Sequence, residues 1–333
     1  MTDVQYGDFD DAWDFNQTVK RTYRKAILAL ERAIDWFLDR KVSFIVNLGD
    51  LIDGRNREIP GASLEALRVV MRQFHRADPI PIIHIIGNHD LYNFTRDELT
   101  EGVHLPSANS PFKCSDNARS PYYSFRISSK WLGIVLDGYD VSPLRIGGGR
   151  LGKELTIASG NVDKLGLDAC QSHNPNDLTI YNMDFMKGLP LGVASRWVPY
   201  NGGISDSQLT WLNETLQSHP SHHVCVFSHL VIHPGATPGM NCHTLMWNYD
   251  EVLEVFEKAG NVRLVLAGHA HAGSRFDDGN CMHVTLPSPL ETKGDDCAAI
   301  VTLDDETVRF EGRGIEGFEF GIKVSDNTST IRL

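Results

Sequence analysis

Residues 82–90 have the sequence Ile-Ile-His-Ile-Ile-Gly-Asn-His-Asp, and this stretch decides the fold class. A short run of β-branched residues is typical of a buried strand, and Gly87 ends it. Asn88 and His89 follow the carboxyl end of that strand, where open α/β sheets place ligand chemistry. By itself, Gly-Asn-His-Asp could equally be an ordinary polar turn. A functional interpretation therefore depends on similar residues at the ends of other strands.

The chain around this stretch alternates between helical and extended patterns. Apolar residues spaced three and four apart predict amphipathic helices over 16–39, 63–74, 205–216 and 251–258. Short apolar runs predict strands at 42–48, 82–86, 130–137, 222–227 and 262–267. The last part is expected to form antiparallel strands at 282–286, 298–303 and 307–311. The alternation of helix and strand over 16–90 indicates an α/β protein with a mostly parallel sheet.

The bulk composition is that of a soluble globular protein. The 333 residues are 41% hydrophobic and 22% charged, and no apolar run approaches the roughly 20 residues that cross a bilayer. No secretory signal is visible in the first residues. A net charge of −12 argues against nucleic-acid binding, and six scattered cysteines without a Cys-x-x-Cys pair favour reduced thiols. We expect a cytoplasmic protein, with a monomer favoured and without a membrane or nucleic-acid partner.

The whole chain, 1–333, is expected to form a single domain. Residues 91–121 are predicted to be loop-rich, and residues 138–203 carry many Gly, Pro, Asn and Asp residues with weak periodicity. Long excursions of this kind are usually functional or mobile, so we interpret 138–203 as a cap or insertion. A separate small domain is disfavoured because no apolar pattern in this segment predicts a core of its own.

Four of the predicted strands end in a residue that can bind a metal ion. These residues are Asp50, Asn88, His229 and His269, and the last is followed by His271. Alternate residues of an extended backbone face the same way, so His269 and His271 together form a sharper candidate than either alone. Asp3 and Gln5 add two donors if the start of the chain also ends a strand. Each candidate alone is more often a turn residue, but their joint occurrence at one sheet edge indicates a metal centre.

The combination of these motifs resembles the calcineurin-like metallophosphoesterases. It comprises Gly49-Asp50, Gly87-Asn88-His89-Asp90, His229 and Gly268-His269-Ala270-His271, and it spans most of the chain. The resemblance implies a sandwich of two mixed β-sheets flanked by helices, with the loop-rich segment as an insertion. Shorter stretches at 3–6, 87–94, 200–203, 247–249, 283–286 and 291–292, together with the aromatic Phe15, are similar to the manganese-dependent ADP-ribose/CDP-alcohol diphosphatases.

The resemblance also implies a two-metal mechanism. One ion would be held by Asp3, Gln5, Asp50 and His271, and the other by Asp50, Asn88, His229 and His269. A hydroxide shared by the two ions would attack phosphorus in line, and His89 would donate a proton to the leaving oxygen. Asp90 either orients His89 or caps the turn, and we favour the turn. Gln5 stands where the wider family usually has histidine, and this oxygen donor favours two Mn²⁺ ions, with Mg²⁺ as the alternative.

The same resemblance implies substrates in which a nucleoside diphosphate carries a further group. Examples are ADP-ribose, cleaved to AMP and ribose 5-phosphate, and CDP-choline, cleaved to CMP and phosphocholine. Candidate residues for nucleotide binding are Phe15, Tyr200, Asn201 and Cys242, with aromatic stacking as the physical reason for the first two. Phe15 could almost equally be a core residue at the start of a helix, and Cys242 could be a buried small hydrophobe.

Two other kinds of function fit the same residues. A phosphodiesterase or phosphoprotein phosphatase could use the same two-metal site, although the excursion at 138–203 favours a covered pocket for a small molecule. A metal-poor scaffold could keep the fold as a binding surface. The nearly complete set of metal ligands argues against the scaffold.

The start of the chain departs from the expected pattern. Asp3 should follow a buried strand, but only Met1 and Thr2 precede it. We therefore expect a truncated start, in which nothing obvious holds Asp3 and Gln5 in place and one metal site is weak. The coding sequence upstream of Met1 tests this expectation, and an in-frame stop codon immediately before it would count against it.

Overall fold

The computed structural model describes residues 1–14, 17–102, 121–148, 162–180, 183–240, 242–324 and 331–332. The α-helices are α1 (Ala26–Asp39), α2 (Ala62–His75), α3 (Asn88–Asn93), α4 (Arg96–Gly102), α5 (Lys164–Gln171), α6 (Asp206–Ser218) and α7 (Tyr249–Ala259). The strands are β1 (Ala12–Trp13), β2 (Lys20–Arg21), β3 (Ile45–Asn47), β4 (Ile82–His84), β5 (Tyr123–Arg126), β6 (Trp131–Val135), β7 (His223–Phe227), β8 (Val262–Ala267), β9 (Ser274–Asp277), β10 (Met282–Thr285), β11 (Ala298–Leu303), β12 (Thr307–Arg313), β13 (Phe320–Lys323) and β14 (Ile331–Arg332). Among the described residues, no helix combines the length and apolar character that a membrane span requires.

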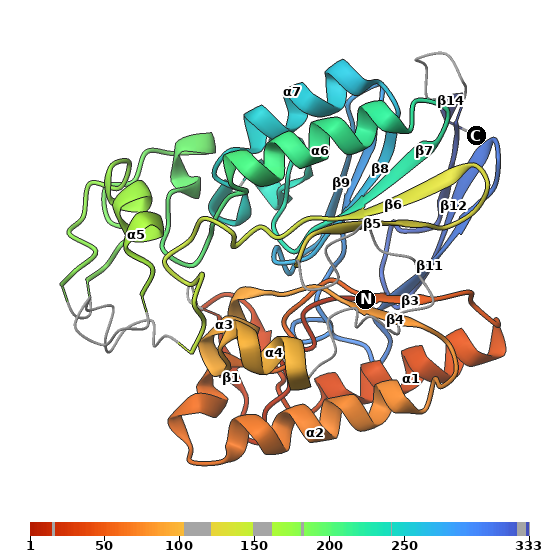
Figure 1. The fold of residues 1–333 in the computed structure, drawn as a ribbon. Coiled ribbons are helices and arrows are strands. Elements are labelled where there is room, and N and C mark those ends of the chain that lie inside the picture. Colours follow the sequence, from red (N-terminus) through yellow and green to blue (C-terminus); the bar gives the residue numbers. More distant parts are fainter. Residues whose placement is uncertain are drawn as a thin grey trace.

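A six-stranded mixed sheet forms one layer, in the order β5-β6-β7-β8-β10-β9. The four inner strands run parallel to one another, whereas β5 and β9 pair antiparallel at the two edges. Helices α6 and α7 cover the outer face of this sheet (Figure 1). Because the inner strands share one direction, their carboxyl ends meet at one edge of the sheet. The loops that follow β7 and β8 at this edge carry His229 and His269.

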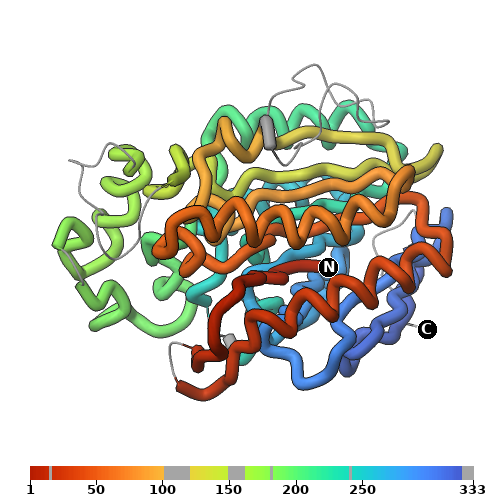
Figure 2. The backbone as a smooth tube through the Cα atoms, turned by 90° about the horizontal axis from the view of Figure 1, so that it is seen from below, coloured from red at the N-terminus to blue at the C-terminus, as the bar shows by residue number. Residues whose placement is uncertain are grey.

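In Figure 1, β3 and β4 lie below the six-stranded sheet and β11 and β12 lie at its right, and together these strands form a second layer. It contains the parallel pair β3-β4 and the antiparallel sheet β11-β12-β13-β14. Helices α1 and α2 run side by side across the side of β3 and β4 that faces away from the six-stranded sheet (Figure 2). The order of layers is therefore helices, sheet, sheet, helices.

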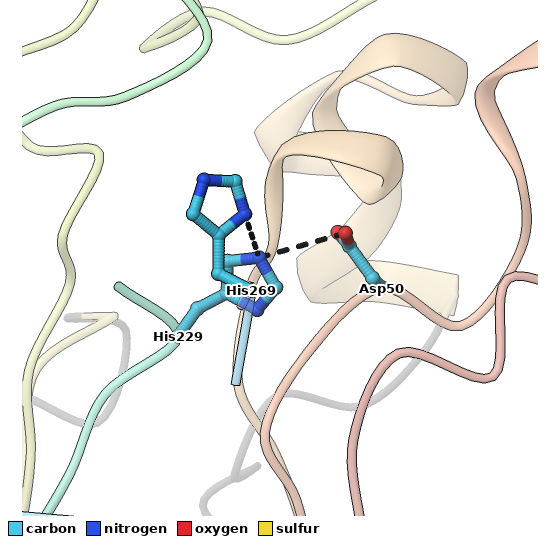
Figure 3. A group of neighbouring side chains, drawn as sticks. All are labelled: Asp50, His229 and His269. Atoms are coloured by element: carbon cyan, nitrogen blue, oxygen red, sulfur yellow. Dashed lines mark hydrogen bonds and ion pairs between the residues drawn. The ribbon is translucent and has the colours of Figure 1, made fainter. Parts of the chain in front are cut away.

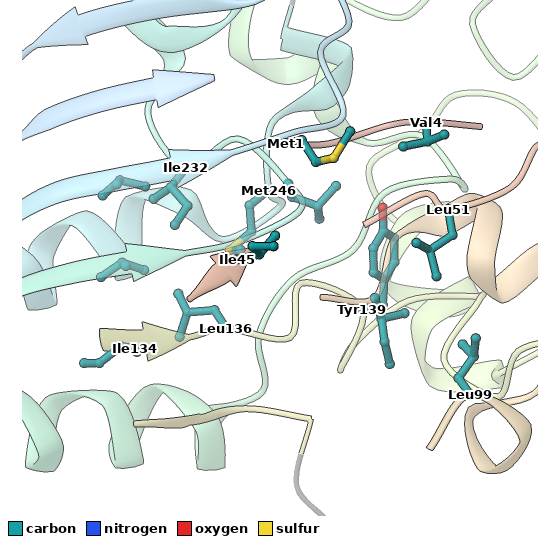
Figure 4. Packing of buried hydrophobic residues seen from close by; sticks show 14 of the residues in the cluster. Met1, Val4, Ile45, Leu51, Leu99, Ile134, Leu136, Tyr139, Ile232 and Met246 are labelled. Atoms are coloured by element: carbon teal, nitrogen blue, oxygen red, sulfur yellow. The ribbon is translucent and has the colours of Figure 1, made fainter. Parts of the chain in front are cut away.

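The two layers of strands pack through an apolar core. Trp131 and Phe227 of the six-stranded sheet belong to one buried cluster with Phe310 of β12. A larger cluster includes residues of α1 and α2, and Figure 4 shows part of it around Met1 and Leu136. Burial of each such side chain contributes about 1.5–3 kcal/mol, so these clusters hold the strand ends in fixed positions.

The expected architecture of two strand layers flanked by helices is confirmed. The segment expected to be loop-rich, 91–121, contains the end of α3 and all of α4, while residues 103–120 lie outside the described residues. Two local expectations are wrong. The helix predicted from residue 16 begins at Ala26, because β1 and β2 form a short antiparallel pair before it. Strand β10 pairs parallel with β8 and so belongs to the main sheet rather than to an antiparallel tail. An apolar run indicates a strand but does not indicate the direction of its partner.

The segment interpreted as a cap, 138–203, contains a small apolar core. Leu167, Cys170 and Leu178 are buried in a cluster with Trp247, which comes from outside the segment. This cluster is not contained in the segment alone, because a residue distant in sequence completes it. Figure 1 shows α5 in a lobe beside the two sheets. Within this segment, 149–161 and 181–182 lie outside the described residues.

Candidate metal centre

Asp50, Asn88, His229 and His269 come together beyond the carboxyl ends of β3, β4, β7 and β8, and each is buried. His229 Nε2 lies 3.2 Å from Asn88 Oδ1, 3.2 Å from His269 Nδ1 and 3.5 Å from Asp50 Oδ2. Figure 3 shows the two imidazole rings and the carboxylate facing one another. The ligand atoms of Asp50, His229 and His269 all lie within 4.8 Å of one another. One metal ion can contact ligand atoms at this spacing.

Asp3, Gln5 and His271 form a second group against Asp50. Gln5 Nε2 lies 3.0 Å from Asp50 Oδ2 and 3.0 Å from His271 Nε2. His271 Nε2 is 3.4 Å from Asp3 Oδ1. The Asp50 carboxylate therefore touches both groups of donors. The structure thus brings together all of the residues that the sequence predicts as metal ligands.

Two buried oxygen atoms in this cluster, Asp3 Oδ1 and Gln5 Oε1, have no hydrogen-bond donor. A buried acceptor without a donor costs about 1–3 kcal/mol, so folded proteins rarely keep one without a compensating partner. Rotation of the Gln5 amide by half a turn exchanges its oxygen and nitrogen, which places Oε1 beside Asp50 and His271. These oxygens fit a bound cation better than a purely structural role.

The backbone at the cluster has an uncommon conformation. Asp3, Gln5, Asp50 and His269 have φ angles of 49°, 41°, 59° and 67°, in the left-handed region that residues other than glycine rarely adopt. Such conformations cost about 1–3 kcal/mol each and gather at functional sites. Gly87 is required for another reason, because a Cβ atom there would overlap Asp50 Oδ1. The surrounding structure must therefore stabilise the positions of the ligands.

The first residues of the chain are held by hydrogen bonds to the loop after β3. Asp3 N–H donates to Gly49 O at 3.0 Å, and Gln5 N–H donates to Asp50 O at 3.0 Å. Ser288 Oγ donates to Asp3 O at 2.7 Å from the other side. The expectation that nothing would hold Asp3 and Gln5 is therefore wrong. The loop after β3 gives the support that a preceding strand was expected to give.

Each predicted histidine ligand is fixed at the ring nitrogen that faces away from the cluster. The acceptors are Leu48 O for His229 Nδ1 at 2.7 Å, Asn201 Oδ1 for His269 Nε2 at 2.9 Å and Glu291 Oε1 for His271 Nδ1 at 2.7 Å. This arrangement selects one tautomer and leaves the other nitrogen as a lone-pair donor, as is typical of metal-bound histidines. This role of Glu291 is not predicted from the sequence, because no motif spacing connects it with His271.

His89 lies beside the cluster with 17% of its side chain exposed. Its Nδ1 is 2.9 Å from the N–H of Gly54 and 3.3 Å from Asp53 Oδ2. Gly54 and Asp53 both lie at the Nδ1 side of the His89 ring, so Nε2 is the nitrogen that can contact a substrate. Asp53 was not singled out from the sequence, where it appears only as part of an Asp-Gly turn.

Asp90 fixes the turn that carries Asn88. Its carboxylate accepts hydrogen bonds from the backbone N–H groups of Asp50, Leu51 and Gly87, each at 2.9 Å. These bonds occupy both carboxylate oxygens and join the loop after β3 to the start of α3. The geometry therefore agrees with the turn-capping alternative, which the sequence analysis favours.

Burial shifts the protonation of the cluster away from the charged forms. It raises the pKa of Asp50 well above its ordinary value and lowers the pKa values of His229 and His269. Burial alone would also lower the pKa of His271, but the carboxylates of Glu291 and Asp3 outweigh it and raise this pKa to about 9. A bound dication favours ionised carboxylates and neutral imidazoles, so it would complete the charge balance of these residues.

The residues predicted to bind the nucleotide lie in different environments. Tyr200 is half-buried, and its ring meets the His269 ring edge-on with 5.8 Å between centroids. Asn201 is fully buried and contacts His269. Cys242 is fully buried in an apolar cluster with Val231, which agrees with the alternative of a small hydrophobic residue. Phe15 lies outside the described residues.

The fold is that of a known class of phosphoesterases. The calcineurin-like phosphoesterase family matches residues 2–273, a span that includes every predicted metal ligand. The chain therefore belongs to the calcineurin-like phosphoesterases.

Within this class, the chain is similar to manganese-dependent ADP-ribose/CDP-alcohol diphosphatases. The protein of that name from Arabidopsis thaliana is 34% identical over 289 residues, which cover 85% of this chain and 82% of the relative. The Homo sapiens protein is 32% identical over 330 residues, which cover 94% and 89%. A dimetal phosphatase structure from Danio rerio superposes with a TM-score of 0.82 and 29% identity, and covers 98% of both chains. The family predicted from the motifs is confirmed.

Proposed function

We propose that this chain is a manganese-dependent hydrolase that cleaves the diphosphate bond of nucleoside diphosphate compounds such as ADP-ribose and CDP-alcohols. The observation that carries the proposal is the buried cluster around Asp50, in which donors from separate chain segments meet. Relatives named for this activity align with 85% and 94% of the chain, and this extent supports the same class of substrate.

The donor set divides naturally into two groups that share Asp50. One ion would be held by Asp3, Gln5, Asp50 and His271, and the other by Asp50, Asn88, His229 and His269. Two such ions would supply an activated water and neutralise the charge that gathers on the phosphoryl oxygens. The oxygen-rich first group suits Mn²⁺ or Mg²⁺ better than a softer metal.

His89 and Tyr200 are the residues of this chain that we assign to the substrate. Asp53 and Gly54 hold His89 Nδ1, so Nε2–H can donate to the leaving oxygen. The leaving group in this reaction is a phosphate monoester, which is stable as an anion, so a weak acid suffices. The half-buried ring of Tyr200 beside His269 offers a surface for stacking of a base.

The segment 138–203 is proposed as a cap on a single domain that spans 1–333. Leu167 and Leu178 pack against Trp247 rather than forming an independent core, which supports the interpretation as one domain. A cap beside the metal centre favours a small substrate over a folded phosphoprotein. The cap also carries Tyr200 at its end, adjacent to the His269 ring.

A panel of four compounds tests the proposed reaction. Purified protein with Mn²⁺ is assayed on ADP-ribose, CDP-choline, a cyclic nucleotide and a phosphopeptide, with products separated by ion-exchange chromatography. We expect AMP with ribose 5-phosphate from the first and CMP with phosphocholine from the second. Faster turnover of the cyclic nucleotide or the phosphopeptide would contradict the proposal and assign the site to a phosphodiesterase or a phosphoprotein phosphatase.

Metal analysis separates the enzyme from a metal-poor scaffold. After dialysis against Mn²⁺ and then buffer, we expect about two Mn per chain. Asp50→Asn should lower this content and abolish hydrolysis, because Asp50 contacts both donor groups. Asp39→Asn, which changes an exposed carboxylate at the end of α1, is the matched control and should leave both unchanged. A folded wild-type protein without bound metal would favour the scaffold.

We also infer that the protein works as a cytoplasmic monomer without a nucleic-acid or membrane partner. The net charge of −12 would repel phosphate backbones, and the scattered cysteines suit a reducing compartment. Light scattering after size exclusion tests the oligomeric state, and a dimer mass would contradict the monomer.

A further inference from the structure

Asn201 lies between the cap segment and the metal centre, and its side chain is completely buried. On one side, its Oδ1 is 2.9 Å from His269 Nε2. On the other side, its Nδ2 is 3.0 Å from Arg196 O, 2.6 Å from His243 O and 3.2 Å from Leu245 O. Every polar atom of the side chain therefore has a partner within the protein.

These contacts determine which way the Asn201 amide points. The three carbonyl oxygens are acceptors only, so the NH₂ group must face them. Oδ1 must then face His269, and since an amide oxygen is only an acceptor, His269 Nε2 must carry the hydrogen. His269 Nδ1 is left with its lone pair, 3.2 Å from His229 Nε2 and toward the metal centre.

The hydrogen bonds of Asn201 connect His269 to the part of the cap segment around Arg196. Arg196 is the last residue of the 3₁₀ helix Gly192–Arg196, and its backbone oxygen also accepts from Trp247 Nε1 at 3.0 Å. In return, Arg196 Nε donates to Trp247 O at 2.6 Å. The Arg196 carbonyl group that helps to orient Asn201 is thus itself held in place, and the amide cannot rotate without breaking several buried hydrogen bonds.

We propose that Asn201 is a positioning residue that fixes the tautomer and ring orientation of His269, so that Nδ1 faces the metal centre. This inference rests on the metal centre of the proposed function. It replaces the expectation that Asn201 contacts the nucleotide, because a fully buried amide with every polar atom paired offers nothing to a substrate.

Replacement of Asn201 should weaken metal binding rather than substrate binding. In Asn201→Ala, we expect Mn²⁺ to bind the group that contains His269 about 10–100-fold more weakly, as measured by electron paramagnetic resonance titration without substrate. At saturating Mn²⁺, the KM for the substrate should remain near that of the wild type. Unchanged Mn²⁺ affinity with a raised KM would overturn the proposal and return Asn201 to the nucleotide site.

Asn174→Ala is the matched control. Asn174 is another buried asparagine, and it donates to Phe185 O at 3.0 Å and to Trp197 O at 2.7 Å within the cap. Among the described residues, its hydrogen bonds all stay within the cap, so its loss should disturb the cap without changing Mn²⁺ affinity. An equal loss of affinity in both variants would show that cap disruption, and not His269 orientation, is responsible.

The wild-type protein supplies a test that does not depend on a folded variant. With histidine labelled by ¹⁵N, two-bond ¹H–¹⁵N correlations of metal-free protein report the tautomer of each ring, and His269→Gln identifies the His269 signals. We expect the Nε2–H form for His269, and the Nδ1–H form would overturn the proposal. This measurement is independent of turnover, so it still decides the role of Asn201 if the diphosphatase activity proves wrong.

Discussion

Glu291 Oε1 lies 2.7 Å from His271 Nδ1 and accepts a further hydrogen bond from Arg21 Nε at 2.8 Å. The guanidinium holds the carboxylate from β2, and the carboxylate in turn orients the last histidine of the Gly-His-x-His motif. His271 Nε2 is thereby directed at Asp3 and Gln5. Charge-assisted bonds of this kind are stronger than neutral ones, so the chain Arg21–Glu291–His271 forms a rigid side of the first donor group.

Glu291→Gln should weaken the binding of the ion that His271 would hold. The substitution keeps the shape of the side chain but removes the charge that stabilises the His271 ring. We expect about tenfold weaker Mn²⁺ binding at one of the two sites, measured by isothermal titration calorimetry. Glu311→Gln is the control, because Glu311 pairs with Arg40 on the surface and should leave binding unchanged. Equal Mn²⁺ affinity in Glu291→Gln and wild type would contradict a positioning role for Glu291.

His89→Asn should lower kcat on ADP-ribose by about 10²–10⁴-fold, because the leaving oxygen loses its proton donor. Mn²⁺ content should stay at the wild-type level, since His89 is not among the predicted ligands. A bis(p-nitrophenyl) phosphate substrate provides a sharper comparison, because its leaving group needs no proton. The loss should be much smaller with that substrate.

An equally large loss with bis(p-nitrophenyl) phosphate would refute the role of His89 as proton donor and favour direct contact with the phosphoryl group. His219→Asn is the control for the loss of an imidazole, because His219 lies at the end of α6 and contacts Thr215 O. Its turnover should match that of the wild type.

Gly87→Ala should disrupt the metal centre from the backbone side. The added Cβ would overlap the Asp50 carboxylate and the Asp50 backbone nitrogen, so either Asp50 or the turn must move. We expect a loss of stability of about 1–3 kcal/mol by urea denaturation, together with loss of Mn²⁺ binding. Gly294→Ala is the matched control, because the nearest atom to its added Cβ is 3.9 Å away. If Gly87→Ala binds metal like the wild type, Gly87 does not approach the loop that carries Asp50 as closely as the structure shows.

Stability should fall below neutral pH in part through His84, which is buried against the ring of Phe74 with 4.8 Å between centroids. Burial lowers the pKa of His84 from 6.5 to about 4. As the pH falls, His84 binds a proton in the unfolded chain before it does so in the folded protein. The contribution of neutral His84 to the free energy of unfolding is therefore fully present above pH 6.5 and is lost as the pH falls toward 4. Between pH 7 and pH 5, the loss amounts to about 2 kcal/mol.

His84→Phe should remove this part of the pH dependence. Urea unfolding of both proteins in EDTA, at pH 7 and pH 5, gives the difference directly and cancels the contributions of the other histidines. If the wild-type protein and His84→Phe lose the same free energy of unfolding between pH 7 and pH 5, His84 takes up no proton on unfolding.

Much of the metal centre follows from the sequence because of where parallel strands end. Asp50, Asn88, His229 and His269 each follow a recognisable apolar strand, and the carboxyl ends of such strands meet at one edge. The two layers of strands are implied by the resemblance to the calcineurin-like metallophosphoesterases, and the structure confirms them. Periodicity is strong in buried strands and long helices, and these are the elements that were predicted well.

The remaining features depend on contacts between residues far apart in sequence. Glu291 reaches His271 from a turn after β10, and Asn201 reaches His269 from the base of the cap. The apolar core of the cap requires Trp247, so no pattern within 138–203 reveals it. The support of Asp3 comes from a backbone hydrogen bond to Gly49 and from the hydroxyl of the distant Ser288, and no local pattern in the sequence indicates either contact.

The left-handed backbone at Asp3, Gln5, Asp50 and His269 bears on how readily metal exchanges. The surrounding hydrogen bonds already keep these four residues in a conformation that costs about 1–3 kcal/mol each, so this cost is met when the chain folds and not when an ion binds. An ion should therefore be held more tightly than by the same donors on a chain that must first adopt this conformation. We expect the centre to retain its metal when the supply in its surroundings falls.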